Sequence, residues 1–136
     1  MISKIILLFA ISLTFISCSE EEGIGGETTL RGYVWQRDYN AEFTKLKFEG
    51  PAQKEDVFII YGSDTTTYND DTKTHFDGSF EFRYLKEGTY TVYVYSKDSS
   101  GIANNIEKPD MVVKRTVTIV SGEDIVELPD TLVILN

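Results

Sequence analysis

The fold is decided by Asp77-Gly78-Ser79-Phe80-Glu81-Phe82 and, a few residues on, by Gly88-Thr89-Tyr90-Thr91-Val92-Tyr93-Val94. Apolar side chains occupy every second position in both runs, and an acidic residue followed by glycine opens or precedes each one. Alternation with period two places one set of side chains on each face of a β-strand, and such acid-glycine pairs are typical of tight turns. The two runs therefore predict two β-strands, each with one buried face.

The same period continues through most of the chain. The other runs that we interpret as strands are Thr28–Trp35, Val57–Tyr61, Met111–Val120 and Thr131–Leu135. β-Branched and aromatic residues dominate every run, and nothing longer than a turn has the helical period of 3.6. Ser121-Gly122 adds a further turn signal. About seven short strands separated by turns predict an all-β fold, a single Greek-key β-sandwich.

Two stretches interrupt the spacing of the strands. Gln36–Asp56 is long enough for an extra strand or for a loop that covers a sheet. Ser99–Asp110 is polar, and we interpret it as a crossover between the two sheets. A chain of 136 residues fits one domain with one modest core. Loops carry function on a rigid scaffold, so both stretches are candidate sites.

The order of residues from Asp77 to Val94 resembles the carboxypeptidase regulatory-like family and the related collagen-adhesin B-type and transthyretin-like domains. The shared features are an Asp-Gly turn, a strand with alternate phenylalanines, a leucine at Leu85 and a Gly-x-Tyr strand. The resemblance extends over roughly Thr28 to Leu135. It implies a transthyretin-like (prealbumin-like) Greek-key sandwich that serves, without catalysis, as an adhesive stalk, a spacer or a binding module.

The first residues have the pattern of an export signal. Lys4 precedes an apolar run from Ile5 to Ile16, which is too short to span a membrane, because a spanning helix needs about 20 apolar residues. Phe15-Ile16-Ser17-Cys18 resembles a bacterial lipobox, in which a small residue precedes the cysteine that is acylated. Cys18 is the chain's one cysteine. We expect a lipoprotein signal peptide at 1–17 and lipid on Cys18; an ordinary secretory signal is the alternative.

An acidic segment, Ser19-Glu20-Glu21-Glu22, and then Gly23-Ile24-Gly25-Gly26 follow Cys18. The acidic segment resembles the export tag of surface lipoproteins in Bacteroidota-type bacteria, which implies an outer-membrane location facing the cell exterior. Glycine-rich charged segments behave as flexible linkers, so we expect a tether at 18–27 and the sandwich domain at 28–136. The net charge of −9 repels phosphate backbones. Nucleic acid is therefore not an expected partner; the membrane, through the lipid, is.

The sequence contains few of the residue patterns that are typical of catalysis or metal binding. His75 is the one histidine, and neither a Gly-x-Ser-x-Gly elbow nor a His-rich metal motif occurs, so we expect no enzyme activity and no cofactor. An enzyme would need a pocket in which His75 meets Arg or Asp partners. Asp64, Asp70, Asp71 and Asp77 offer the oxygen ligands that calcium prefers. Their spacing matches no calcium loop, so we interpret them as solvated turn residues and expect no metal site.

The candidate ligand-binding residues are aromatic. Tyr33, Trp35, Tyr93 and Tyr95 occupy the polar faces of their strands and would form an exposed platform for a glycan or protein ligand. The alternative is that this face packs on the second sheet or lies under residues 36–56. Two functions stay open. An exposed aromatic patch would favour an independent binding or adhesion module. A long unpaired edge strand would favour a structural accessory subunit of an envelope assembly such as a transporter or pilus.

Overall fold

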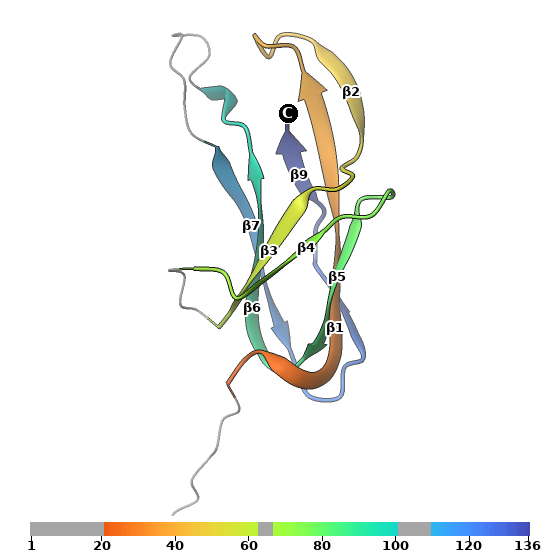
Figure 1. Cartoon of the computed structure of the whole chain (residues 1–136), viewed down its shortest axis with the longest axis vertical. Coiled ribbons are helices and arrows are strands. Elements are labelled where there is room, and N and C mark those ends of the chain that lie inside the picture. Colours follow the sequence, from red (N-terminus) through yellow and green to blue (C-terminus); the bar gives the residue numbers. More distant parts are fainter. Residues whose placement is uncertain (1–20, 63–66, 101–109) are drawn as a thin grey trace, which may run out of the picture.

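The chain folds into two β-sheets that enclose one core (Figure 1). The structure is a computed structural model that describes residues 21–62, 67–100 and 110–136. Its strands are β1 (Ile24–Tyr39), β2 (Leu46–Pro51), β3 (Asp56–Tyr61), β4 (Asp70–Lys73), β5 (Ser79–Leu85), β6 (Gly88–Ser96), β7 (Met111–Ile119), β8 (Ile125–Glu127) and β9 (Leu132–Leu135). One sheet contains β1, β2, β5, β8 and β9, and the other has the order β4-β3-β6-β7. The predicted all-β sandwich is confirmed.

Three strands lie outside the runs that the alternating pattern predicts. β2 falls within residues 36–56, where an extra strand was one of two expectations. β4 has the sequence Asp-Asp-Thr-Lys, and β8 is three residues long. Short or polar strands carry almost no alternating apolar signal, so the expected number of about seven strands is too low.

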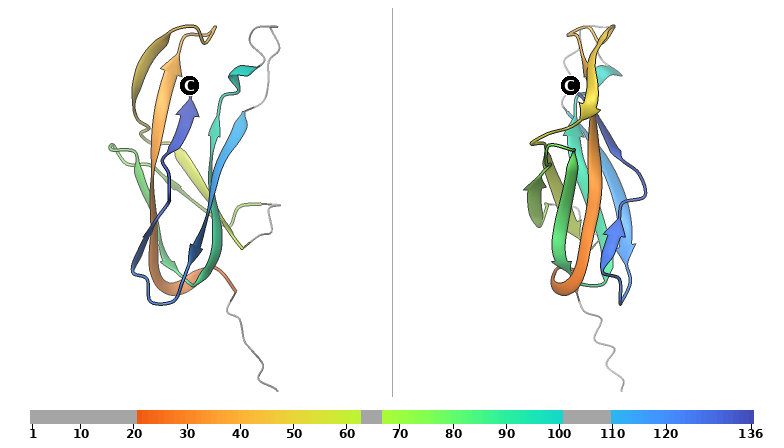
Figure 2. Two further views of the ribbon diagram at one scale, coloured as in Figure 1. Left: turned by 180° about the vertical axis from the view of Figure 1, so that it is seen from behind. Right: turned by 90° about the vertical axis from the view of Figure 1, so that its right-hand side faces the viewer.

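β1 is the central strand of the five-stranded sheet. Its first part pairs antiparallel with β5 and parallel with β8, and its last part pairs antiparallel with β2 and parallel with β9. In Figure 2, β1 runs along most of the molecule, with β5 beside its lower part and β2 beside its upper part. Gly32 lies opposite Phe80 of β5, and its lack of a side chain leaves space for the Phe80 ring, since a Cβ there would lie 2.5 Å from that ring.

β1 begins at Ile24, four residues before the predicted start of the strand at Thr28. The residue before it is already fixed: the Gly23 amide donates to the Tyr90 hydroxyl at 2.9 Å, and the Lys86 amide donates to the Gly23 carbonyl at 2.8 Å. The chain is thus joined to β6 and to the β5–β6 turn from Gly23 onward.

The first residues of β1 lie so close to the β5–β6 turn that a side chain would not fit at Gly26. A Cβ at Gly26 would lie 2.1 Å from the Leu85 carbonyl oxygen. The residues from Gly23 to Glu27, expected as part of the tether at 18–27, are therefore ordered with the domain: Gly23 is hydrogen-bonded to it, and Ile24 to Glu27 belong to β1. Cys18 and the signal segment 1–17 lie outside the described residues, so lipid attachment stays a prediction. Within the described ranges, no helix is long and apolar enough to cross a membrane.

The four-stranded sheet is regular. β6 and β7 pair over nine successive positions, from Gly88 opposite Ile119 to Ser96 opposite Met111, with no register shift. β3 pairs with the other side of β6, and β4 pairs with β3. Because β6 and β7 are neighbours in one sheet, the interpretation of 99–110 as a crossover between sheets is wrong.

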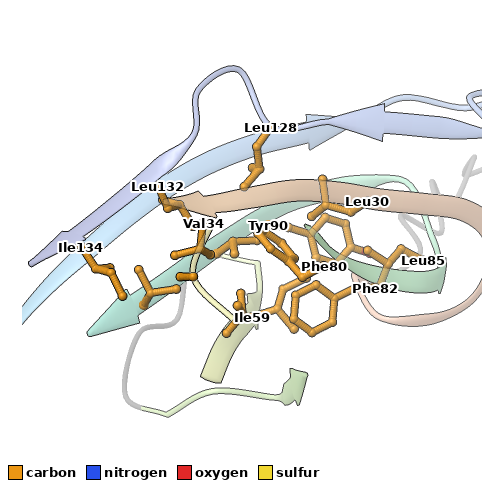
Figure 3. Close-up of a cluster of buried hydrophobic side chains, with 14 of the residues drawn as sticks. Leu30, Val34, Ile59, Phe80, Phe82, Leu85, Tyr90, Leu128, Leu132 and Ile134 are labelled. Carbon is orange, nitrogen blue, oxygen red and sulfur yellow. The ribbon is translucent and has the colours of Figure 1, made fainter. Parts of the chain in front are cut away.

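The inward side chains of both sheets form the core (Figure 3). Its buried members are Leu30, Val34, Ala52, Val57, Ile59, Phe80, Phe82, Leu85, Tyr90, Val92, Val94, Ile119, Leu128, Leu132 and Ile134. The alternation in β6 is confirmed, and in β5 it is confirmed at Phe80 and Phe82. It is wrong at Tyr84, which the same period places on the inward face: Tyr84 has a positive φ of 61° and is 63% exposed, and Leu85 is buried in its place. The intervening positions of β6 consequently face outward from the sandwich.

Candidate ligand-binding surface

The four aromatic residues predicted as one platform are divided between the two sheets. Tyr33 and Trp35 lie on β1, and Tyr93 and Tyr95 lie on β6. All four alternate with buried neighbours and so point away from the core, with Tyr33 43% and Tyr95 45% exposed. The outer faces of the two sheets of a sandwich point in opposite directions. The structure therefore brings together Tyr93 and Tyr95 but not all four residues.

The larger aromatic group lies on the four-stranded sheet, and we call it the aromatic cluster: Phe58, Tyr68, Tyr93 and Tyr95. Phe58 is directly opposite Tyr93 in the ladder, and their rings stack with centroids 5.1 Å apart and planes inclined by 20°. The Tyr68 and Tyr95 rings lie 4.8 Å and 5.6 Å from the Phe58 ring, and the Tyr93 and Tyr95 rings are 5.8 Å apart. Tyr68 and Tyr95 are each 45% exposed.

Two members of the cluster were missed in the sequence. Phe58 lies in the run Val57–Tyr61, whose nearly continuous apolar character predicts burial on both faces. In the structure Val57 and Ile59 are fully buried, whereas Phe58 is half-buried on the outer face. Tyr68 precedes the polar strand β4, and no local signal predicts its contact with Phe58.

A groove of about 510 Å³ lies beside the cluster. Its lining combines apolar groups with hydroxyls and one cation: Ile60, Thr67, Thr91, Tyr93, Tyr95, Val112 and Lys114. Burial raises the pKa of the Tyr93 hydroxyl, and the nearby Tyr95 hydroxyl raises it further. Tyr93 therefore remains a neutral hydroxyl, able both to donate and to accept a hydrogen bond, throughout the physiological pH range.

The face that carries Tyr33 and Trp35 has a different character. The Trp35 indole donates to Glu49 at 3.1 Å, and Arg37 lies 3.6 Å from the same carboxylate. Glu81 lies between Arg31, at 3.7 Å, and Arg83, which contacts it directly. Neither aromatic residue of this face contacts another ring in the part of the chain that is described. This surface is a network of ion pairs, with its aromatic side chains apart.

A second hollow, of about 330 Å³, contains His75 with Arg31, Asp77 and Ser79 in its lining. The residues that an enzyme would need are thus present, but their hydrogen bonds serve the turn. Asp77 Oδ1 accepts from the Ser79 hydroxyl at 2.6 Å and from the Ser79 amide at 3.0 Å. These bonds lower the pKa of Asp77, and among the described residues no hydrogen bond joins the His75 imidazole to Asp77 or to Ser79. The arrangement closes the β4–β5 turn and does not form a nucleophile-base relay.

The acidic residues considered for calcium are spread out. Asp70 and Asp71 belong to β4, Asp77 belongs to the following turn, and Asp64 lies outside the described residues. Across residues 21–62, 67–100 and 110–136, no three His, Cys, Asp or Glu side chains lie close enough together to hold a metal ion.

No family model matches the chain, and no curated protein matches it. The resemblance to carboxypeptidase regulatory-like domains therefore stays a prediction. A crystal structure from Pseudomonas aeruginosa, described as that of "a putative carbohydrate binding protein", is similar to this chain with 15% sequence identity and a TM-score of 0.46. The match covers 84% of this chain and 91% of the other. An identity and a TM-score this low transfer neither a ligand nor a role.

Proposed function

We propose that this chain is a non-catalytic carbohydrate-binding lipoprotein that contacts its ligand through the aromatic cluster. The observation that carries the proposal is the clustering of four aromatic side chains beside a groove on one outer face. Soluble proteins keep most large aromatic side chains inside, so a group of exposed rings is typical of a binding surface.

The chemistry of the groove favours a sugar over a purely apolar ligand. A pyranose ring has a C–H face that stacks on an aromatic ring and a rim of hydroxyls that need hydrogen-bond partners. The Tyr95 ring is the exposed stacking surface, and the hydroxyls of Thr67, Thr91 and Tyr93 line the same groove. Apolar walls with a few polar groups are the usual composition of a small-ligand site.

The experiment that tests this proposal is a glycan array probed with the full chain, purified in detergent micelles. Tyr95→Ala removes the exposed stacking ring, and we expect it to abolish most of the signal. Tyr33→Ala is the matched control, because Tyr33 is equally exposed but lies on the opposite sheet. Binding that survives Tyr95→Ala and is lost in Tyr33→Ala would move the site to the ion-paired face and contradict the proposal.

We further propose that the domain is held at the outer membrane, facing the cell exterior, by lipid on Cys18. The support is the apolar run from Ile5 to Ile16, the Ser17-Cys18 pair and the acidic residues after it. Metabolic labelling with an alkyne fatty acid tests the modification, with Cys18→Ala as the control. Label that persists in Cys18→Ala contradicts lipidation at this residue, and protection of the domain from protease added to intact cells contradicts surface display.

One observation favours the alternative function, a structural subunit of an envelope assembly. β7 is a nine-residue strand at the edge of its sheet, and in the described residues its ladder has a partner on the β6 side alone. Such an edge is open to pairing with a strand of another protein. Cross-linking in intact cells distinguishes the two functions, because a stoichiometric partner on β7 supports an assembly subunit and recovery of the protein alone supports an independent binder.

A further inference from the structure

A single row of side chains crosses the four strands of the β4-β3-β6-β7 sheet. Asp71 on β4 lies opposite Phe58 on β3, and Phe58 lies opposite Tyr93 on β6. Tyr93 lies opposite Lys114 on β7. The row therefore has a carboxylate at one end, two stacked rings in the middle and an ammonium at the other end. With strands about 4.8 Å apart, its Cα atoms span about 14 Å.

The ammonium end of the row lies at the groove. Lys114 lines the groove together with Tyr93 and Tyr95, and it is exposed. Two other basic residues occur on the strands of this sheet, and both are paired: Lys73 with Asp56, and Arg115 with Asp130 at 3.6 Å. Lys114 forms no ion pair in the described part of the chain. Its charge is thus available to a ligand.

The opposite end of the row has the opposite charge. Asp71 is exposed on β4, a strand that also carries Asp70. The nearest cation on the same strand, Lys73, is engaged by Asp56. An anionic group is therefore attracted at the β7 end of the aromatic cluster and repelled at the β4 end. The whole chain has a net charge of −9, so the local cation at the groove stands out against an acidic background.

From this polarity we propose that the ligand is a glycan containing a uronic acid, bound with its carboxylate at Lys114 and its neutral face over Tyr95. The inference rests on the proposed function and adds the class of sugar and its direction across the sheet. Asp71 contributes to specificity in the opposite way from Lys114, because its negative charge repels an acidic group at the β4 end of the row.

The size of the effect follows from the exposure of Lys114. Exposed ion pairs contribute little, so loss of the Lys114 charge should weaken binding of the acidic glycan by about two- to fivefold at low salt. The same change should leave binding of a neutral glycan unaltered. Raising the ionic strength should reduce the difference, because exposed charges are screened.

The test uses pairs of oligosaccharides that contain glucuronate, galacturonate or mannuronate, each compared with its carboxyl-reduced counterpart. Titration calorimetry of the full chain in detergent micelles measures each affinity. We expect at least one acidic member to bind more tightly than its reduced counterpart, Lys114→Met to weaken that member alone, and Asp71→Asn to strengthen it. Lys47→Met on β2 of the other sheet removes the same charge elsewhere and should change nothing.

The outcomes separate this inference from the function on which it rests. Equal affinity for acidic and reduced members, with binding still lost in Tyr95→Ala, overturns the uronic acid proposal and leaves carbohydrate binding intact. An equal effect of Lys47→Met and Lys114→Met also overturns it, because net charge alone would then explain the result. Binding to none of the pairs, acidic or neutral, counts against the proposed function itself. Unchanged thermal unfolding of each variant confirms that the fold is intact.

Discussion

The hydroxyl of Tyr90 joins the first described residues of the chain to the sandwich, and its removal gives a quantitative test of this structure. The side chain is fully buried, and its oxygen accepts from the Gly23 amide at 2.9 Å and donates to the Lys86 carbonyl at 2.8 Å. Tyr90→Phe keeps the ring and deletes both bonds. We expect it to loosen the start of β1 and to destabilise the domain.

The magnitude can be worked out from these two contacts. A buried donor left without a partner costs about 1–3 kcal/mol, and the loss of the bond to the partly buried Lys86 carbonyl adds about 0.5–1 kcal/mol. The sum is about 1.5–4 kcal/mol. For a domain of this size, this corresponds to a fall in Tm of about 6–17 °C.

Tyr61→Phe is the matched control. The Tyr61 ring lies edge-on to the Tyr90 ring with centroids 5.7 Å apart, but its hydroxyl makes no hydrogen bond with the described residues. We expect Tyr61→Phe to change stability by less than about 0.5 kcal/mol. Thermal and urea unfolding followed by circular dichroism measure both variants, and hydrogen exchange at Gly23 reports the local effect. Equal, small losses in the two variants would refute the assigned role of the Tyr90 hydroxyl.

Three further changes have defined outcomes. The bonds from Ser79 lower the pKa of Asp77 below its usual 3.8. The stabilisation that they give is therefore present above pH 3.8 and is lost as the pH falls through the pKa of the folded state. Between about pH 5 and pH 2, the unfolding midpoint of Asp77→Asn should fall less than that of the unmodified chain. Gly26→Ala places a methyl group 2.1 Å from the Leu85 carbonyl oxygen and should lower the free energy of unfolding by more than about 3 kcal/mol. Gly122→Ala, at φ +87° with nothing within 4 Å, is the control and should lower it by about 1 kcal/mol. Equal losses in urea unfolding would contradict the close approach of β1 to β5 at Gly26. Phe80→Ala removes a side chain that is 1% exposed and should cost about 3–5 kcal/mol by the same measurement.

The sequence predicts what is local in this fold. Alternation identifies the inward residues of β6 and the first part of β5 because a strand repeats every two residues whatever its partners are; it fails at Tyr84, where the backbone leaves the extended conformation. The same rule shows that Tyr33 and Tyr93 both point outward. It does not show to which sheet each strand belongs, because pairing joins distant residues. The prediction of one platform assumed a shared face, and the topology divides it.

For the same reason, the sequence predicts only two of the four members of the aromatic cluster, Tyr93 and Tyr95. Phe58 and Tyr93 are separated by 35 positions in the chain and meet through the register of β3 on β6. Lys114 joins the row through the register of β7, and Asp71 through that of β4. Each residue is an ordinary strand residue in its own segment. The charge polarity of the surface is therefore a property of the paired sheet and has no signature in any single run of sequence.

The glycine-rich start of the domain is a further example, and it affects how the proposed lipid would hold the site. Composition alone predicts a flexible tether as far as residue 27, but a hydrogen bond to Tyr90, 67 positions away, fixes the chain at Gly23. From Cys18 to Gly23 there are five steps along the chain, which span at most about 18 Å. The lipid would therefore hold the end of the sandwich at Gly88 close to the membrane surface. β6 rises by about 3.4 Å per residue from Gly88, so Tyr95 lies about 24 Å farther along the strand. If Cys18 carries the proposed lipid, a domain whose β6 stands perpendicular to the membrane would hold the aromatic cluster well above the lipid headgroups, where a large glycan would reach it.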